Sequence, residues 1–344
     1  MQRPPPTLRT LAADLGISVF TVSEALRESP RVRPATRQRV QAEAARQGYV
    51  PNALIGGALS AVRRSRQQRF RGTVALIDAD DRDPEHYLIF HRAISKGARA
   101  RARELGFATE PFWLGEEPGG LPAARLPGVL RARGIGGAVL LPFHRPRDLS
   151  DFDLGGLAVV QMDHSVVRPR LHTVLPDHYV SMTRALERLA ARGYRRIGLC
   201  LESRKEERIL HKWSAAFLAF MRRTGRPGAG MAMITPNLTR DTFRAWVRAK
   251  RPDAILGHAD AIPRWLGEMK HRVPDDVGFV NLNLTEATRA CAGLDLGPER
   301  LGAVAVETLV AMLHRREAGV PEQPQAIALE ARWVEGPTLR PPAE

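Results

Sequence analysis

The sequence is poor in cysteine and contains no long apolar run. Cys200 and Cys291 are the only cysteines among 344 residues, and one such pair provides neither a disulfide framework nor a metal-binding spacing. Both stand among apolar residues, so we expect both to be buried. No stretch approaches the ~18 apolar residues of a membrane-spanning helix, and residues 4–6 are prolines where a secretory signal needs an apolar core. We expect a soluble cytoplasmic protein.

The residue patterns that mark common active sites are also missing. The first apolar stretch of the body ends in residues 78–81, Asp-Ala-Asp-Asp, which are acidic and do not form a glycine-rich phosphate loop. No Ser/His/Asp arrangement and no HExxH motif occurs. His172 and His178, with Asp177 between them, match no familiar ligand set, and the simplest interpretation is two loop histidines. We predict no enzyme activity, no cofactor and no metal site.

Positive charge is concentrated in the amino-terminal fifth of the chain. Residues 1–71 contain 13 arginines, no lysine and four acidic residues, which gives a net charge of +9 out of the formal +15. The remaining 273 residues therefore carry only +6. A basic segment joined to a nearly balanced body is typical of proteins that bind a polyanion such as nucleic acid.

The same basic segment predicts a helix-turn-helix. An apolar stripe at helical spacing consists of Leu8, Leu11, Ala12 and Leu15. Residues 16–18, Gly-Ile-Ser, interrupt this first helix, because glycine tolerates a tight left-handed corner and serine caps a new helix. A second helix is expected over residues 19–27, and a third begins near Pro34 and ends near Gly48. In a helix-turn-helix the second helix enters the DNA major groove.

In its order and spacing, this segment resembles the DNA-binding domain of the LacI/GalR family of bacterial transcriptional regulators. The resemblance implies that residues 1–50 form a helix-turn-helix DNA-binding domain. The residues that carry it are Leu11-Ala12, Gly16-Ile17-Ser18, Thr21-Val22-Ser23, Thr36-Arg37, Val40 and Gly48-Tyr49-Val50-Pro51-Asn52.

The resemblance also implies which side chains meet DNA. Family members read base edges from the positions of Val19, Phe20 and Glu24. Apolar side chains suit thymine methyl groups, and a glutamate accepts from cytosine N4. Many relatives carry an arginine where Glu24 stands, so we expect a different operator sequence. Phosphate contacts, which position the domain without reading sequence, are expected from Ser18, Thr21, Ser23, Arg31, Arg33 and Thr36.

Residues 51–71 form the predicted hinge and linker. The family pattern here is Pro-Asn-x-x-Ala-x-x-Leu, a short helix that inserts its leucine into the minor groove. This chain has Ile55 and Ala58 at the alanine and leucine positions, and Leu59 comes one residue late. Either Leu54 or Leu59 inserts through a shifted helix, or the protein bends DNA less. The candidate hinge residues are Asn52, Leu54, Ile55, Ala58 and Leu59.

From residue 72 onward, short apolar strands alternate with longer helical stretches. This repetition predicts an α/β fold with parallel sheets covered on both faces, and residues 72–340 suffice for two Rossmann-like lobes. The expected strands are 73–78, 107–114, 137–142, 157–162, 196–201, 231–234, 254–257 and 277–282. The expected helices include 90–105, 179–192, 212–224 and 301–316.

The body resembles the same family and so implies a pair of lobes of the periplasmic-binding-protein type, with three chain crossings between them. Ligands of open parallel sheets bind at the carboxyl ends of strands. The motifs that carry the resemblance are Pro176-Asp177, Arg192-Gly193-Tyr194-Arg195-Arg196-Ile197, Asp253-Ala254-Ile255-Leu256, Val273-Pro274-Asp275-Asp276-Val277 and Leu301-Gly302-Ala303-Val304-Ala305.

Strand ends and the resemblance together suggest a set of effector-binding residues. Asp260 matches an effector-binding position of the family. Trp213 stands where relatives commonly carry an arginine that grips the effector, and a tryptophan can either stack on a sugar ring or fill the cleft. The candidate effector-binding residues are Asp80, Asp81, Asp163, Trp213, Asp260 and Asn283.

We therefore predict a sequence-specific, DNA-binding transcriptional regulator that acts on nucleoid DNA. A homodimer is expected because one recognition helix reads few base pairs, whereas a two-fold pair reads a palindromic operator. A small-molecule effector, with a sugar or sugar derivative as one candidate, would bind between the lobes. Repression is the favoured mode, and ligand-dependent activation is the alternative. An enzyme with a DNA-binding domain, or a sugar transport component, would need residues that the chain does not show.

Overall fold

The computed structural model describes residues 8–26, 32–47, 71–79, 86–116, 120–143 and 145–341. Contacts within the chain divide it into two compact units, residues 1–69 and 70–344. Several predicted site residues lie outside the described residues: Arg31, Asn52, Leu54, Ile55, Ala58, Leu59, Asp80 and Asp81.

The amino-terminal unit contains three helices with a small core of their own. They are α1 (Leu8–Leu15), α2 (Val19–Leu26) and α3 (Pro34–Arg46). Gly16 turns the chain between α1 and α2 with a left-handed φ of 64°. The Ser18 hydroxyl accepts a hydrogen bond from the Thr21 N–H at 3.0 Å and so caps α2. The predicted helix-turn-helix is confirmed. Its core consists of Leu11, Ala12, Val22, Ala25, Val32, Val40 and Ala44.

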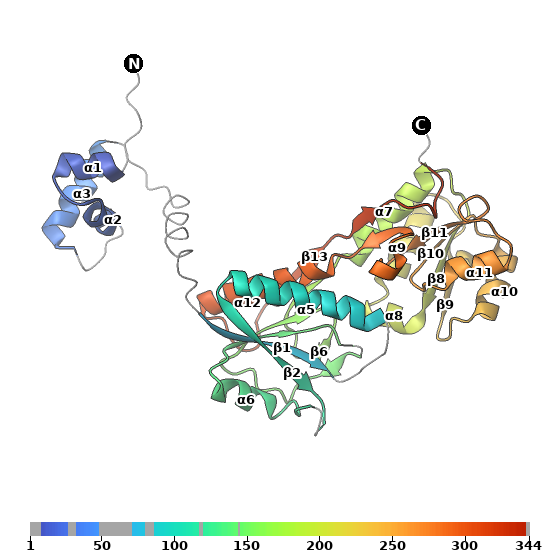
Figure 1. Cartoon of the computed structure of the whole chain (residues 1–344), viewed down its shortest axis with the longest axis horizontal. Helices are drawn as coiled ribbons and strands as arrows, with labels where there is room; N and C mark the ends of the chain where they lie inside the picture. Colours follow the sequence, from blue (N-terminus) through green and yellow to red (C-terminus); the bar gives the residue numbers. More distant parts are fainter. Residues whose placement is uncertain are drawn as a thin grey trace, which may run out of the picture. The chain divides into compact units, whose positions relative to one another are not determined.

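The first lobe of the body is built on a six-stranded parallel sheet (Figure 1) with the order β13-β7-β5-β3-β1-β2. Helices α5 (His86–Glu104) and α12 (Pro298–Arg315) pack on one face, and α6 (Leu126–Ala132) packs on the other. The strands are β1 (Gly72–Ala79), β2 (Phe107–Leu114), β3 (Gly137–Leu140), β5 (Ala158–Met162), β7 (His172–Pro176) and β13 (Ala326–Leu329). A separate pair consists of β4 (Arg147–Asp148) and β6 (Val166–Arg168).

The second lobe has another six-stranded sheet, with the order β14-β12-β11-β10-β8-β9. Its strands are β8 (Ile197–Glu202), β9 (Ala232–Thr235), β10 (Ala254–Gly257), β11 (Gly278–Asn281), β12 (Ala292–Asp295) and β14 (Arg332–Val334). Its helices are α7 (His178–Ala191), α8 (Ser203–Arg208), α9 (Lys212–Arg223), α10 (Arg240–Lys250) and α11 (Ile262–Glu268), with short 3-10 turns at Ala229–Met231 and Glu286–Thr288. Helices α7 and α9 cover one face of the sheet, and α10 and α11 cover the other.

The chain passes between the lobes three times, as predicted. It leaves the first sheet after β7, returns after β12 to form α12 and β13, and crosses again to end in β14. The expectation of purely parallel sheets is wrong at one edge, because β14 runs antiparallel to β12. A strand that follows directly from β13 in the other lobe does not require the helical crossover that makes neighbouring strands parallel.

Two further expectations need correction. The sequence pattern missed β4, β6, β7, β12, β13 and β14, which are two to five residues long. Strands of this length establish no period, and only some of them, such as β10, were recognised as apolar runs. Cys200 is fully buried as expected, but Cys291 is only half-buried, because it lies in the segment between a surface turn and β12.

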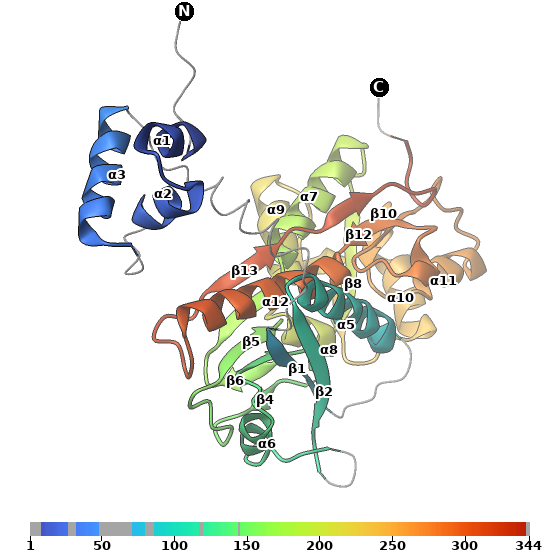
Figure 2. The ribbon, with the colours of Figure 1, turned by 60° about the vertical axis from the view of Figure 1, so that its left-hand side comes forward.

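Helices α5 and α12 lie side by side against the first sheet (Figure 2). Their backbones approach closely at two glycines. A Cβ atom on Gly97 would lie 1.9 Å from the Glu299 carbonyl oxygen, and one on Gly302 would lie 2.1 Å from the Ile94 carbonyl oxygen. Only glycine permits this approach. Lys96 also pairs with the Glu299 carboxylate at 2.7 Å across the two helices.

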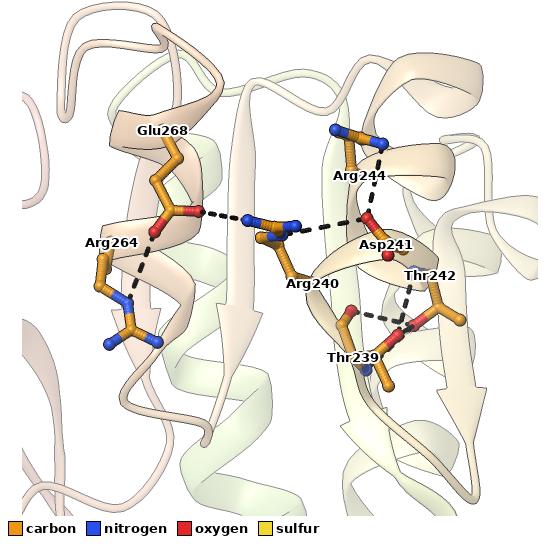
Figure 3. A network of polar contacts seen from close by, with 7 residues as sticks. All are labelled: Thr239, Arg240, Asp241, Thr242, Arg244, Arg264 and Glu268. Carbon is orange, nitrogen blue, oxygen red and sulfur yellow. Dashed lines mark hydrogen bonds and ion pairs between the residues drawn. The ribbon is translucent and has the colours of Figure 1, made fainter.

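A surface network ties the start of α10 to α11 (Figure 3). Thr239 and Thr242 form a capping box at the amino end of α10. The Arg240 guanidinium lies 3.9 Å from Asp241 and 3.8 Å from Glu268. These ion pairs are exposed to solvent, so each contributes at most about 1 kcal/mol.

Candidate functional site

Polar side chains gather at the carboxyl ends of neighbouring strands in the second lobe. Glu202 ends β8, and its Oε2 lies 3.5 Å from Nε2 of His258, the residue after β10. Asn281 ends β11 and donates from Nδ2 to Asp260 Oδ1 at 3.5 Å, while the Asn283 N–H donates to Asn281 Oδ1 at 2.8 Å. Because the crevice of an open parallel sheet lies at these strand ends, this edge is the candidate ligand-binding cleft.

Trp213, in the first turn of α9, forms an aromatic wall beside these residues. Its indole stacks on the His258 imidazole with centroids 6.1 Å apart, and it meets the His178 ring edge-on at 5.0 Å. The exposed fractions are 4% for Trp213, 3% for His178 and 6% for His258. The tryptophan therefore fills the wall of the cleft, packed into the core beneath α7 and α9.

Five of these side chains carry a buried polar atom that has no hydrogen-bond partner within the described part of the chain. Burying such an atom without a partner costs about 1–3 kcal/mol, so natural proteins rarely collect several in one place. Unpaired atoms around a cleft are typical of groups that a ligand satisfies. The atoms are Asp163 Oδ1, His178 Nδ1, Trp213 Nε1, His258 Nδ1 and Asn283 Oδ1.

Burial keeps the imidazoles of the cleft uncharged at neutral pH. It lowers the pKa of both His178 and His258 to about 4. The hydrogen bond to His258 lowers the pKa of Glu202, which therefore accepts as a carboxylate. A neutral His258 that donates from Nε2 to Glu202 has an unprotonated Nδ1. That nitrogen offers the cleft a hydrogen-bond acceptor.

The first lobe contributes a turn that directly follows β5. Asp163 Oδ2 lies 4.0 Å from Arg208 Nε in α8, and His164 Nε2 lies 3.1 Å from Lys212 Nζ at the start of α9. Burial lowers the pKa of His164. Both contacts join the first lobe to the second at the same edge of the sheets.

The predicted effector-binding residues fall into two groups. Asp163 and Trp213 are both near His178, which feels the charge of Asp163 and contacts the indole. Asp260 and Asn283 are linked through Asn281. Asp80 and Asp81 lie outside the described residues. The role of these residues as effector ligands stays a prediction.

Several residues of the cleft were not predicted from the sequence. His178 was expected in a loop, but it is the buried first residue of α7, and the cause of the error is that β7 was not recognised. His258 could have been predicted, because it directly follows the expected strand at 254–257 and precedes Asp260 by two residues. Nothing in the sequence distinguished Arg208 and Lys212 from solvent-exposed basic residues.

In the helix-turn-helix, the candidate base-reading residues belong to α2. Val19 is 40% exposed and Glu24 is half-buried, while the side chain of Phe20 lies outside the described set. Of the candidate phosphate-binding residues, Ser18 and Thr21 form the cap of α2, with their hydroxyl oxygens 2.8 Å apart. Arg33 is exposed at the N-cap of α3 and Thr36 lies in its first turn; the Ser23 side chain is not described. Their contacts with DNA stay predictions.

Two other kinds of site receive no support among the described residues. No group of three or more His, Cys, Asp or Glu side chains there is arranged to hold a metal ion. No described helix combines the length and apolar character needed to cross a membrane.

Two family models match the chain. Residues 7–52 match the bacterial regulatory proteins of the lacI family, and residues 186–339 match a periplasmic-binding-protein-like domain. The two matches correspond to the helix-turn-helix unit and to the second lobe with the end of the chain.

Curated relatives are transcriptional regulators. The chain is 30% identical over 195 residues to the HTH-type transcriptional regulator CelR of Thermobifida fusca, a match that covers 56% of this chain and 54% of that protein. It therefore spans about half the length of CelR. The chain is 25% identical over 301 residues to the HTH-type transcriptional repressor CytR of Escherichia coli K12, with 81% of each protein covered.

Solved structures share the fold. A CelR–cellobiose complex has a TM-score of 0.59 and 24% identity, and covers 97% of this chain and 99% of that one. The lac repressor dimer bound to operator and an anti-inducer has a TM-score of 0.58 and 18% identity, with 97% and 99% covered. These likenesses show that the α/β architecture with a helix-turn-helix unit is that of known repressors.

Proposed function

Because this chain belongs to the LacI family of bacterial regulatory proteins, we propose that it is a cytoplasmic transcriptional repressor. A homodimer binds a palindromic operator in nucleoid DNA, and a small molecule held between the two lobes sets the operator affinity. Residues 1–50 read DNA, and residues 72–340 bind the effector and form the dimer. Residues 51–71 connect these two parts. No enzyme activity is part of this proposal.

The observation that carries the proposal is the pairing, in one chain, of a basic helix-turn-helix unit with a body whose cleft contains several unsatisfied polar atoms. Val19 and Glu24 lie on the recognition helix α2 at the positions from which relatives read bases. Ser18, Thr21 and Arg33 stand around them at helix ends, where hydroxyl, guanidinium and backbone N–H groups bind phosphate. A net charge of +9 over residues 1–71 supplies the electrostatic attraction to DNA.

The cleft favours an uncharged effector that donates hydrogen bonds. Asp163 Oδ1, Asn283 Oδ1 and His258 Nδ1 are acceptors, Trp213 Nε1 is a donor, and His178 Nδ1 takes either role according to its tautomer. A ligand rich in hydroxyl groups, such as a sugar or sugar derivative, suits this balance. The related CelR is known in complex with cellobiose. We assign effector contacts to Asp163, Trp213, Asp260 and Asn283.

The experiment that tests the proposal is selection of bound duplexes from a random DNA pool by the purified full-length protein. Enrichment of one palindromic sequence is the expected result. Repeating the selection with mono- and disaccharides present should lower or raise the recovery of that sequence. A protein that enriches no sequence at low ionic strength would show the proposal to be wrong.

A further inference from the structure

Two cationic side chains of the second lobe reach a single turn of the first lobe. The Arg208 guanidinium lies 4.0 Å from the Asp163 carboxylate, and Lys212 Nζ lies 3.1 Å from His164 Nε2. An ammonium group has only donors, so the His164 Nε2 atom accepts and the imidazole is neutral. The side chains of Arg208 and Asp163 are only 25% and 11% exposed, so the contact is partly shielded from water.

One backbone conformation in this contact is unusual. Six non-glycine residues in the described parts of the chain have positive φ angles in the left-handed region. Five of them stand at or next to helix ends, where this conformation is common: Leu210, His211, Arg251, Lys270 and Arg316. The sixth is Asp163, with φ 54°, which follows a strand and belongs to the contact between the lobes.

A short connection on the second lobe links the two cations. Helix α8 ends at Arg208 and α9 begins at Lys212, so only residues 209–211 separate them. The N–H groups of Leu210 and His211 donate to carbonyl oxygens of the last turn of α8 at 3.0 and 2.8 Å, which closes the carboxyl end of that helix. These hydrogen bonds fix the spacing between Arg208 and Lys212 on the second lobe.

We propose that Arg208 and Lys212, together with the turn at Asp163-His164, form a latch that holds the two lobes together. The two polar contacts favour this latched arrangement over one in which the lobes move apart. A ligand that hydrogen-bonds to Asp163 acts on one side of the latch and shifts the balance as far as its affinity differs between the two arrangements. The link from the latch to operator affinity rests on the proposed function, but the latch itself does not.

The test is a distance measurement between the lobes of the full-length protein. Nitroxide labels are placed at Ala124→Cys in the first lobe and Ala245→Cys in the second, both exposed. The half-buried Cys291 is replaced by serine, and the fully buried Cys200 stays unlabelled. Labelled chains are diluted with unlabelled chains, so that pulsed electron spin resonance reports distances within one chain. The double substitution Arg208→Met and Lys212→Met is expected to add a longer distance to the distribution.

Matched controls remove the same charges elsewhere on the second lobe. Arg240→Met takes an arginine out of the surface network of α10, and Lys270→Met removes an exposed lysine at the far end of α11. Neither touches the first lobe, so both should keep the distance of the unsubstituted chain. If the latch variant gives the same distribution as these controls, the latch does not exist.

Two further variants show whether the double variant separates the lobes or only misfolds. Lys212→Met alone should give a smaller population of the longer distance. Arg208→Lys keeps a positive charge opposite Asp163 and should retain the shorter distance. An unchanged distribution for Lys212→Met, or a longer distance for Arg208→Lys, would also refute the latch. Binding to the selected duplex is measured separately: a change of about fivefold or more links the latch to DNA binding, and an unchanged affinity refutes that link alone.

Discussion

His178 and His258 are buried titratable groups, and their protonation must be linked to folding. Burial lowers the pKa of each to about 4, whereas an imidazole in an unfolded chain has its ordinary pKa near 6.5. The unfolded chain therefore binds more protons between these two values. The stability that neutral imidazoles provide is complete above pH ~6.5 and is lost as the pH falls towards 4.

This linkage predicts a measurable pH dependence of the unfolding of the body. Each histidine contributes a slope of up to about 1.4 kcal/mol per pH unit below its unfolded pKa. His258→Gln keeps a donor for Glu202 but cannot take up a proton, so it should reduce the slope. Urea titrations between pH 5 and 7, followed by circular dichroism, measure the difference. Equal slopes for the variant and the parent chain would mean that His258 is protonated as readily in the folded state.

On the recognition helix, Glu24 should determine base preference. Glu24→Ala removes the proposed acceptor for a cytosine amino group and should relax the preference at one base pair of each half-site by about 1–3 kcal/mol. Competition gel shifts with duplexes substituted at each position provide the measurement. Unaltered preference at every position would remove Glu24 from the base-reading set.

Arg33 at the N-cap of α3 should act differently. Arg33→Ala is expected to weaken binding to all duplexes alike and to reduce the salt dependence by about one counterion. Arg46→Ala is the matched control, because Arg46 lies at the other end of α3 and pairs with Glu43. Titrations at several salt concentrations distinguish the two variants. If Arg46→Ala has the same effect as Arg33→Ala, the phosphate contact is not local to the N-cap.

Some residues of the cleft could be predicted from the sequence, whereas others depend on contacts between distant segments. Asp163, Asp260 and Asn283 follow strands that the apolar pattern reveals, and the strand-end rule placed them correctly at the edge of the sheets. His178, Arg208 and Lys212 owe their position to tertiary contacts. No local pattern separates a lysine in contact with an imidazole of another lobe from a lysine in water.

At the scale of elements, the close approach of α5 and α12 predicts that alanine at Gly302 destabilises the protein, whereas alanine at Gly128 does not. Gly302→Ala would place a Cβ atom 2.1 Å from the Ile94 carbonyl oxygen, so the helices must move apart, at a cost of about 1–3 kcal/mol. Gly128→Ala in α6 meets no atom within 4 Å and should be neutral or stabilising by up to about 1 kcal/mol. Denaturant unfolding of both variants measures the contrast. Equal stabilities would mean that the helices adjust freely.

The elements themselves were largely predictable where a period could develop. The strand at 107–114 and the strand at 254–257 match β2 and β10 residue for residue. Not every short strand could be recognised. In β13 the residues are apolar, but three of the four are exposed, and the segment is a strand through its pairing with β7. Pairing with a strand distant in sequence therefore determines that this segment is a strand.

At the scale of the whole molecule, the proposed homodimer makes a prediction about stoichiometry. Two chains should bind one palindromic duplex, with half-site centres separated by about one helical turn or a multiple of it. Scrambling one half-site should lower the affinity by more than about a hundredfold, because several base-pair contacts are lost together. Analytical ultracentrifugation of the complex gives the stoichiometry. One chain per duplex, with full affinity for a single half-site, would contradict the dimer.

The three passages of the chain between the sheets have a consequence for engineering new specificities. Neither lobe is encoded by a single uninterrupted stretch, since residues 326–329 return to the first sheet and residues 332–334 close the edge of the second. A chimera that takes one lobe from a relative as a single contiguous gene segment would therefore leave a foreign strand at the border of one sheet. Exchanging one lobe without this defect requires at least two segments.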